Sequence, residues 1–183
     1  MREISLHLLD LVQNSIEAGA STVEITVDED EAGYFVFIVA DNGRGMNKEL
    51  VNSVRDPFVT TRLTRKVGLG LALLSMSTAR CGGFLDIQSQ EGKGTKVKAA
   101  FLQDHLDRPP LGDLAATLKV LLTANPALRV IVNYKSGGGE FLLDSMQLRE
   151  ILGESLDFGH PEVYSWLSDY LKQEIGKVGK SGR

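Results

Sequence analysis

The sequence has a single cysteine, no long apolar run and no excess of basic charge. Cys81 is the only cysteine among 183 residues, which excludes a disulfide within the chain and a metal site built from several cysteines. No uninterrupted apolar stretch is long enough to cross a membrane. The formal net charge of −4 does not indicate a nucleic-acid partner. The simplest prediction is a soluble protein of a reducing cytoplasm, without a membrane segment.

The composition is typical of a globular protein, with 43% apolar and 24% charged residues. A length of 183 residues fits one large domain, or one domain and a small second one. Residues 104–110 are polar and end in two prolines, as linkers often do. We therefore predict a first domain over 1–103, a linker over 104–110, a small α+β domain over 111–175 and a flexible tail over 176–183.

Hydrophobic periodicity predicts helices and strands along the whole chain. Residues 4–18 carry an apolar helical stripe that ends at Gly19, and residues 22–27 and 34–40 read as two strands of a hairpin. Residues 58–66 form a polar, basic loop without a period. Further helices are predicted at 48–55, 68–79, 111–123, 145–152 and 161–175, and further strands at 84–89, 95–102, 128–134 and 140–144.

Three groups of residues predict a site for a purine nucleotide with a metal ion. Asp41 follows the apolar strand over 34–40, where its carboxylate could accept a hydrogen bond from an exocyclic amine. Asp10 and Asn14 share one helix face, and an amide oxygen is a suitable ligand for Mg²⁺. Residues 68–70, Gly-Leu-Gly, open a helix after a basic loop, and such helix starts bind phosphate.

With these segments placed, residues 1–103 resemble the ATPase superfamily of gyrase B, Hsp-ninety type chaperones, histidine kinases and MutL proteins. Residues 10–20 are similar to the N box, most of all in its MutL form. Residues 41–46, Asp-Asn-Gly-Arg-Gly-Met, resemble the first glycine box. Residues 56–62 are similar to the F box of histidine kinases, and residues 68–71 and 92–95 resemble the later glycine boxes.

The resemblance implies a two-layer α/β sandwich of the Bergerat type. A mixed sheet is then covered by helices on one face, with ATP between the helices and a mobile lid, which we expect over 47–67. Asn14 takes the Mg²⁺ position, Asp41 the adenine position, and Asp10 the position of the general base. The candidate nucleotide-binding residues are Asn14, Asp41, Gly43, Gly45, Met46, Thr61, Arg62, Lys66, Gly68, Leu69, Gly70, Leu71 and Thr95.

Two positions depart from the family pattern. Asp10 stands where hydrolysing members carry glutamate, so its carboxylate arm is one methylene shorter. Lys66 stands where the second glycine box usually begins with glycine, which predicts a stiffer lid hinge. Asp10 has an alternative as an ion-pair partner or solvated helix residue, and Gly68 and Gly70 have one in close helix packing. One of Arg62, Arg65 and Lys66 is expected to contact the γ-phosphate.

The function then has three readings. Because no histidine lies in a phosphoacceptor segment, the chain is not expected to be a complete sensor kinase. The first reading is a Mg-ATP-binding ATPase or kinase-like phosphotransferase that acts on or with a separate protein. The second is an ATP-gated interaction protein, which binds a partner or a second copy of itself. The third is a MutL-like clamp, although the acidic second half offers no obvious basic face for DNA.

Overall fold

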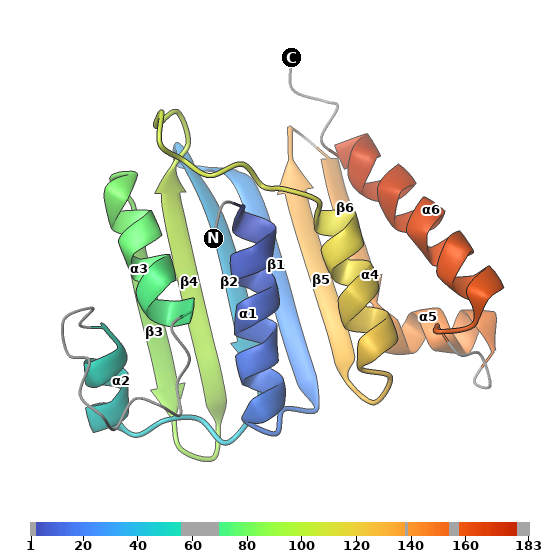
Figure 1. Ribbon diagram of the computed structural model, residues 1–183, viewed down its shortest axis with the longest axis horizontal. Helices are drawn as coiled ribbons and strands as arrows, with labels where there is room; N and C mark the ends of the chain where they lie inside the picture. The colour runs from blue at the N-terminus through green and yellow to red at the C-terminus, as the bar shows by residue number, and fades with distance from the viewer. Residues whose placement is uncertain (1–2, 56–69, 138, 154–157, 179–183) are drawn as a thin grey trace.

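The computed structural model describes residues 3–55, 70–137, 139–153 and 158–178 (Figure 1). The helices are α1 (Ile4–Glu17), α2 (Lys48–Arg55), α3 (Gly70–Arg80), α4 (Leu114–Ala124), α5 (Ser145–Leu152) and α6 (Pro161–Val178). The strands are β1 (Thr22–Glu31), β2 (Tyr34–Asp41), β3 (Phe84–Gln90), β4 (Gly94–Leu102), β5 (Arg129–Ser136) and β6 (Gly139–Asp144). The predicted elements within these residues are confirmed, with small shifts at their ends.

The strands form one mixed sheet in the order β3-β4-β2-β1-β5-β6. Strands β1 and β5 are parallel, and every other neighbouring pair is antiparallel. The predicted hairpin is the pair β1 and β2, in which Ile25 lies opposite Val39. On its other side, Ile25 lies opposite Val132 of β5. The central strand β1 therefore joins the first half of the chain to the second.

The helices cover one face of this sheet, as predicted. Figure 1 shows α1, α3 and α4 lying side by side over the same face. On β1 the side chains alternate, so that Val23, Ile25 and Val27 are buried under the helices while Glu24 on the opposite face is exposed. This period of two follows from the pleat of a strand. The hydrophobic core consequently lies between the sheet and the helical layer.

The second half of the chain shares this sheet and core, which differs from the predicted division at 104–110. Strand β5 pairs with β1 over seven residue pairs, and its Val130 and Val132 belong to the same buried cluster as Phe37. A parallel partner must be reached by a crossover connection, which 103–128 provides. The prolines at 109–110 thus lie within a crossover rather than in a linker between two cores, and α6 continues into the predicted tail as far as Val178.

The crossover segment also holds the start of α1. Glu3 makes no side-chain cap for this helix. Instead, the N–H groups of Ile4 and Ser5 donate to the carbonyl oxygens of Pro110 (3.0 Å) and Leu111 (2.9 Å). The first N–H groups of a helix have no acceptor within the helix, so these two bonds anchor its first turn. The second half of the chain thereby helps to position the helix that carries Asp10 and Asn14.

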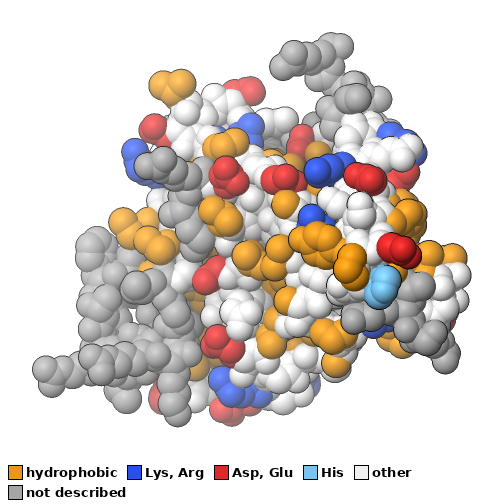
Figure 2. Space-filling model, turned by 45° about the vertical axis from the view of Figure 1, so that its right-hand side comes forward, with side chains coloured by type: hydrophobic (Ala, Val, Ile, Leu, Met, Phe, Trp, Pro, Cys, Tyr) orange, Lys and Arg blue, Asp and Glu red, His pale blue; other side chains and the backbone are white. Residues whose placement is uncertain are grey.

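The C-terminal helices leave part of their hydrophobic surface exposed. Val120 of α4 and Tyr164 and Trp166 of α6 are exposed, and Trp166 stacks on Tyr170 with ring centroids 5.2 Å apart. Figure 2, in which this side is turned forward, shows hydrophobic side chains gathered among charged ones. No helix in the part of the chain that the structure describes is long and apolar enough to cross a membrane.

Candidate functional site

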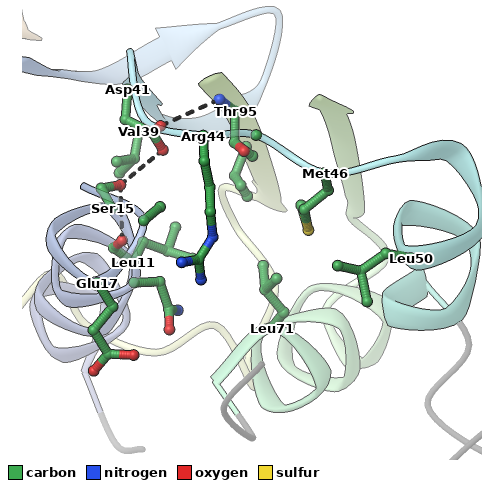
Figure 3. Close-up of a pocket in the computed structure, with 14 residues that line it drawn as sticks. Leu11, Ser15, Glu17, Val39, Asp41, Arg44, Met46, Leu50, Leu71 and Thr95 are labelled. Carbon is green, nitrogen blue, oxygen red and sulfur yellow. Dashed lines mark hydrogen bonds between the residues drawn. The ribbon is translucent and has the colours of Figure 1, made fainter. Parts of the chain in front are cut away.

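A pocket of about 640 Å³ opens between α1, the end of β2, strand β4 and the start of α3 (Figure 3). One side is apolar, where Met46, Leu50 and Leu71 point toward one another. The other side is polar and carries Asp41, Ser15 and Thr95. Its lining residues are Leu11, Asn14, Ser15, Glu17, Ala18, Val39, Asp41, Arg44, Gly45, Met46, Leu50, Leu71, Thr95 and Val97.

Asp41 ends β2, and its carboxylate is held from three directions. Ser15 Oγ donates to Oδ2 at 2.9 Å. The backbone N–H groups of Gly43 and Thr95 donate to Oδ1 at 2.8 and 3.3 Å. An ionised carboxylate offers about four acceptor positions, so it can accept a further donor from a ligand in the pocket. These bonds fix the orientation of the carboxylate before any ligand binds.

The loop after Asp41 is tied to the end of α1 and to the start of β1. The Asn42 side-chain oxygen accepts from the N–H groups of Ser21 (2.9 Å) and Thr22 (3.0 Å). The N–H of Arg44 donates to the carbonyl oxygen of Ala18 at 2.9 Å. Asn42 thus uses its side chain for structure and does not line the pocket, whereas the Arg44 side chain extends into it.

Gly45 lets this loop pass close to the turn between β3 and β4. Its φ is +66°, and an added Cβ would lie 2.0 Å from the carbonyl oxygen of Gln90. Only glycine satisfies both conditions without strain. The N–H of Met46 then donates to Ser89 Oγ at 2.8 Å, and Ser89 Oγ lies 2.8 Å from Thr95 Oγ1. The first and last glycine boxes are therefore joined through Ser89.

Asn14 has the properties expected of a ligand-binding residue. It lines the pocket, and its Nδ2 atom is buried without a hydrogen-bond partner among the described residues. Among the described residues, this nitrogen therefore does not brace the surrounding structure. In the part of the chain that the structure describes, no three His, Cys, Asp or Glu side chains gather so that they could hold a metal ion. The side-chain oxygen of Asn14 is a ligand type that Mg²⁺ accepts, since this ion usually takes few protein ligands and completes its shell with phosphate and water oxygens.

Asp10 lies one helical turn before Asn14, next to the pocket but not among its lining residues. Its Oδ2 atom is buried and has no hydrogen-bond partner among the described residues. Burial raises the pKa of Asp10, and the nearby charge of Glu17 raises it further. The carboxylate lies against Gly70 at the start of α3.

The structure brings together most of the predicted residues that it describes. Asn14, Asp41, Gly45, Met46, Leu71 and Thr95 line the pocket. Gly43 is buried between Asp41 and Ala18, and Gly70 starts α3 beside Asp10. Five predicted residues, as well as the F box and most of the expected lid, lie outside the described residues: Thr61, Arg62, Lys66, Gly68 and Leu69.

Three polar residues of the pocket were not predicted: Ser15, Glu17 and Arg44. Ser15 could have been predicted from the sequence, because a hydroxyl on the buried stripe of a helix needs a hydrogen-bond partner. Arg44 could also have been predicted, because it stands between Gly43 and Gly45, two of the candidate nucleotide-binding residues. For Glu17 the sequence offered only one indication, its proximity to Asn14 on the same helix.

Residues 2–105 match the sequence profile of a family described as histidine kinase-, DNA gyrase B-, and HSP90-like ATPase. The chain belongs to this family. It is 31% identical over 108 residues to a putative NtrY-like sensor histidine kinase of Rickettsia conorii, over 58% of this chain and 18% of that protein. It is 36% identical over 89 residues to the sensor histidine kinase ZraS of Escherichia coli, over 48% of this chain and 19% of that protein. The chain therefore spans less than a fifth of the length of these relatives.

Two solved structures share the fold of this chain. The MutL ATPase domain of Aquifex aeolicus, complexed with ADP, is 18% identical, with a TM-score of 0.52 over 83% of this chain and 69% of that one. The N-terminal domain of a DNA repair protein is 20% identical, also with a TM-score of 0.52, over 79% of this chain and 53% of that one. Both matches cover more of the chain than residues 2–105, which agrees with the single sheet.

Proposed function

We propose that this chain binds ATP with Mg²⁺ in the pocket between α1 and α3 and acts as a weak ATPase or kinase-like module with a separate protein partner. The observation that carries the proposal is the carboxylate of Asp41, which three donors orient at the wall of a pocket of about 640 Å³. Ordinary small-molecule sites have volumes in this range. The ADP bound to the MutL ATPase domain supports a nucleotide as the ligand.

Each part of the pocket suits one part of the nucleotide. The apolar side chains of Met46, Leu50 and Leu71 offer contacts for a flat base, and Asp41 can accept a hydrogen bond from its exocyclic amine. The side-chain oxygen of Asn14 would hold Mg²⁺, which supplies charge neutralisation for the phosphates. Arg44 extends into the same space and adds a positive charge for an anionic ligand.

Hydrolysis would require a base beside the phosphates, and Asp10 is the candidate. It lies on the same helix as Asn14, and its Oδ2 has no partner among the described residues. We propose that Asp10 accepts the proton of the attacking water. Because aspartate is shorter than glutamate and lies beside the pocket rather than in its wall, we expect turnover to be slow.

Base recognition is tested by titrating the protein with ATP and with inosine triphosphate, which has a carbonyl oxygen in place of the amine. We expect ATP to bind about ten-fold more tightly or better, since the wrong base leaves Asp41 without its donor. Asp41→Asn should reduce this preference, whereas Asp169→Asn on the exposed side of α6 should keep it. If neither nucleotide binds with Mg²⁺ at millimolar concentration, the proposal is wrong.

The role of Asn14 in metal binding and the role of Asp10 as general base are tested separately. Asn14→Ala should weaken ATP binding when Mg²⁺ is present and change it little when the metal is removed with EDTA. Asp10→Asn should lower turnover by about 10²–10⁴-fold and leave ATP affinity near that of the wild type, because it keeps the shape and removes the base. Turnover of Asp10→Asn equal to that of the wild type would exclude Asp10 as the base.

A second function, an ATP-gated interaction protein, is favoured by one observation. The carboxylate of Asp10 lies against Gly70 and is not part of the pocket wall. In this alternative function, ATP binding changes the affinity of the protein for a partner or for a second copy of itself. Hydrolysis is then absent, or serves only to return the protein to its ATP-free state. Measuring ADP release, together with the sedimentation of the protein with and without a non-hydrolysable ATP analogue, separates the two. A MutL-like clamp is the third alternative, supported by the shared fold alone.

A further inference from the structure

Gly70, the first residue of α3, lies directly against the carboxylate of Asp10. A Cβ atom added to Gly70 would lie 1.5 Å from Asp10 Oδ2 and 2.6 Å from its Cγ. Real Cβ atoms do not approach other atoms closer than 3.0 Å, so a side chain at this position would displace the carboxylate. Asp10 therefore occupies the space that any other residue at position 70 would fill.

The backbone of α3 does not itself require glycine at this position. Gly70 starts a regular helix and is not among the residues with positive φ. Alanine favours a helix over glycine by about 1 kcal/mol, so local preference favours alanine. The glycine is explained by the room that it leaves for Asp10 rather than by a special conformation.

We propose that Gly70 is a positioning residue, which holds the carboxylate of Asp10 at the start of α3. Gly70 does so by leaving the space that the carboxylate fills, since Asp10 Oδ2 has no hydrogen-bond partner among the described residues. The catalytic consequence rests on the proposed function, in which Asp10 is the base. Gly70 is followed by Leu71, which lines the pocket. One turn of α3 therefore contacts both the ligand pocket and Asp10.

The contact itself is tested by thermal unfolding of the full chain without nucleotide. Gly70→Ala should lower the melting temperature by about 2–4 °C or more, which corresponds to at least ~1 kcal/mol for a chain of this size. In the background Asp10→Ala, the same change should no longer lower it. In the background Asp10→Asn the loss should persist, because asparagine has the same shape. An equal loss in the Asp10 and Asp10→Ala backgrounds would overturn the proposal.

Gly176→Ala is the matched control for this cycle. Gly176 also lies inside a helix, without positive φ, and an added Cβ would meet nothing within 4 Å. We expect this variant to melt at the same temperature as the wild type or above it, in both the Asp10 and the Asp10→Ala backgrounds. A Gly176→Ala loss that depends on Asp10 would show that the cycle does not report on the contact.

The role in catalysis is tested by a split between kcat and KM. Gly70→Ala keeps the backbone N–H, so KM for ATP should stay within about three-fold, whereas kcat should fall about 10–100-fold because the base is misplaced. A wild-type kcat in Gly70→Ala would overturn the positioning role. If the wild-type protein does not hydrolyse ATP, the proposed hydrolysis fails, whereas the unfolding cycle still decides whether Gly70 makes room for Asp10.

Discussion

The half of the molecule that contains the pocket and the half formed by the C-terminal part of the chain differ in how their helices begin. Helix α1, on the pocket side, begins without a side-chain cap. Helices α4 and α5, on the C-terminal side, each begin at a capping aspartate. Asp113 accepts from the N–H of Ala116 at 2.8 Å, and Asp144 accepts from the N–H of Met146 at 3.0 Å. The first N–H groups of α1 are instead taken by carbonyl oxygens of the crossover segment. Helices α4 and α5 are thus capped locally, whereas the start of the helix that carries Asn14 depends on residues far away in the chain.

The two sides also differ, in part, in how their polar side chains are paired. On the C-terminal side, Arg129 pairs with Asp144 at 2.6 Å, and the hydroxyl of Tyr134 donates to Glu29 at 2.8 Å. On the pocket side, Asp10 Oδ2 and Asn14 Nδ2 are buried without partners among the described residues. Leaving such atoms unpaired costs free energy, and the atoms remain available for a ligand. Among the described residues the C-terminal side has one such atom, Asn133 Oδ1 on β5, so buried unpaired atoms are more frequent on the pocket side but are not confined to it.

Removing residues 104–183 is expected to have the largest effect, because it takes away support that α1 and β1 receive from the C-terminal side. Strand β1 would lose β5, and the first turn of α1 would lose its acceptors. We expect the fragment 1–103 to lack a cooperative unfolding transition in urea, followed by circular dichroism. A chain truncated after Val178 should unfold like the wild type. Cooperative unfolding of 1–103 with normal ATP binding would show instead that the predicted first domain is independent.

His7 provides a test on the pocket side, because it is buried with both ring nitrogens unpartnered among the described residues. Burial lowers the pKa of His7 from 6.5 to about 4. In the unfolded chain His7 therefore binds a proton below pH 6.5, whereas in the folded chain it stays neutral down to about pH 4. The free energy of unfolding consequently falls as the pH drops through this window. We expect a loss of about 2 kcal/mol between pH 7 and pH 5, measured by urea unfolding.

His7→Leu should remove most of this pH dependence, and His160→Gln, at an exposed position, should retain it. If the two variants show the same change in unfolding free energy between pH 7 and pH 5, the dependence comes from another group.

Asp144→Ala tests the C-terminal side, where we expect stability to fall and binding to stay. The variant loses the cap of α5, worth about 0.5–2 kcal/mol, together with the pair to Arg129. The hydrogen bond from Arg129 lowers the pKa of Asp144, so its contribution is present above the unfolded value of 3.8 and is lost as the pH falls below it. Urea unfolding measures the loss, and ATP titration should show unchanged affinity. A weaker affinity would mean that the two sides are coupled.

Ser15→Ala should have the smallest effect, and in contrast to Asp144→Ala we expect the effect on ATP binding. It removes the hydroxyl that donates to Asp41 Oδ2 at 2.9 Å. We expect ATP affinity to fall about five-fold, or ~1 kcal/mol, because the carboxylate is held less firmly. The preference for ATP over inosine triphosphate, measured by titration, should narrow with it. The control Ser168→Ala lies on α6, where it should leave both values unchanged; an unchanged preference in Ser15→Ala would separate Ser15 from base recognition.

Local patterns were sufficient to predict the elements of the fold and much of the pocket. The apolar run before Asp41 predicts a buried strand, and Asn47 is a residue type that favours the start of a helix. Its side-chain oxygen accepts from the N–H of Leu50 at 2.9 Å at the start of α2. The four-residue spacing of Asp10 and Asn14 places them on one face of α1. Such signals depend on residues close together in the chain, so periodicity alone reveals them.

What the sequence by itself determined is which residues end strands, start helices and share helix faces, since hydrophobic spacing and turn chemistry act over a few residues. Only the tertiary structure decided that β5 pairs with β1, and that the crossover at 103–128 therefore joins one core. It likewise decided that Ser15 reaches Asp41 and that Asp10 rests on Gly70. These contacts join residues from 26 to 107 positions apart in the chain, and long-range pairing depends on the packing of the whole sheet and helical layer rather than on any local pattern.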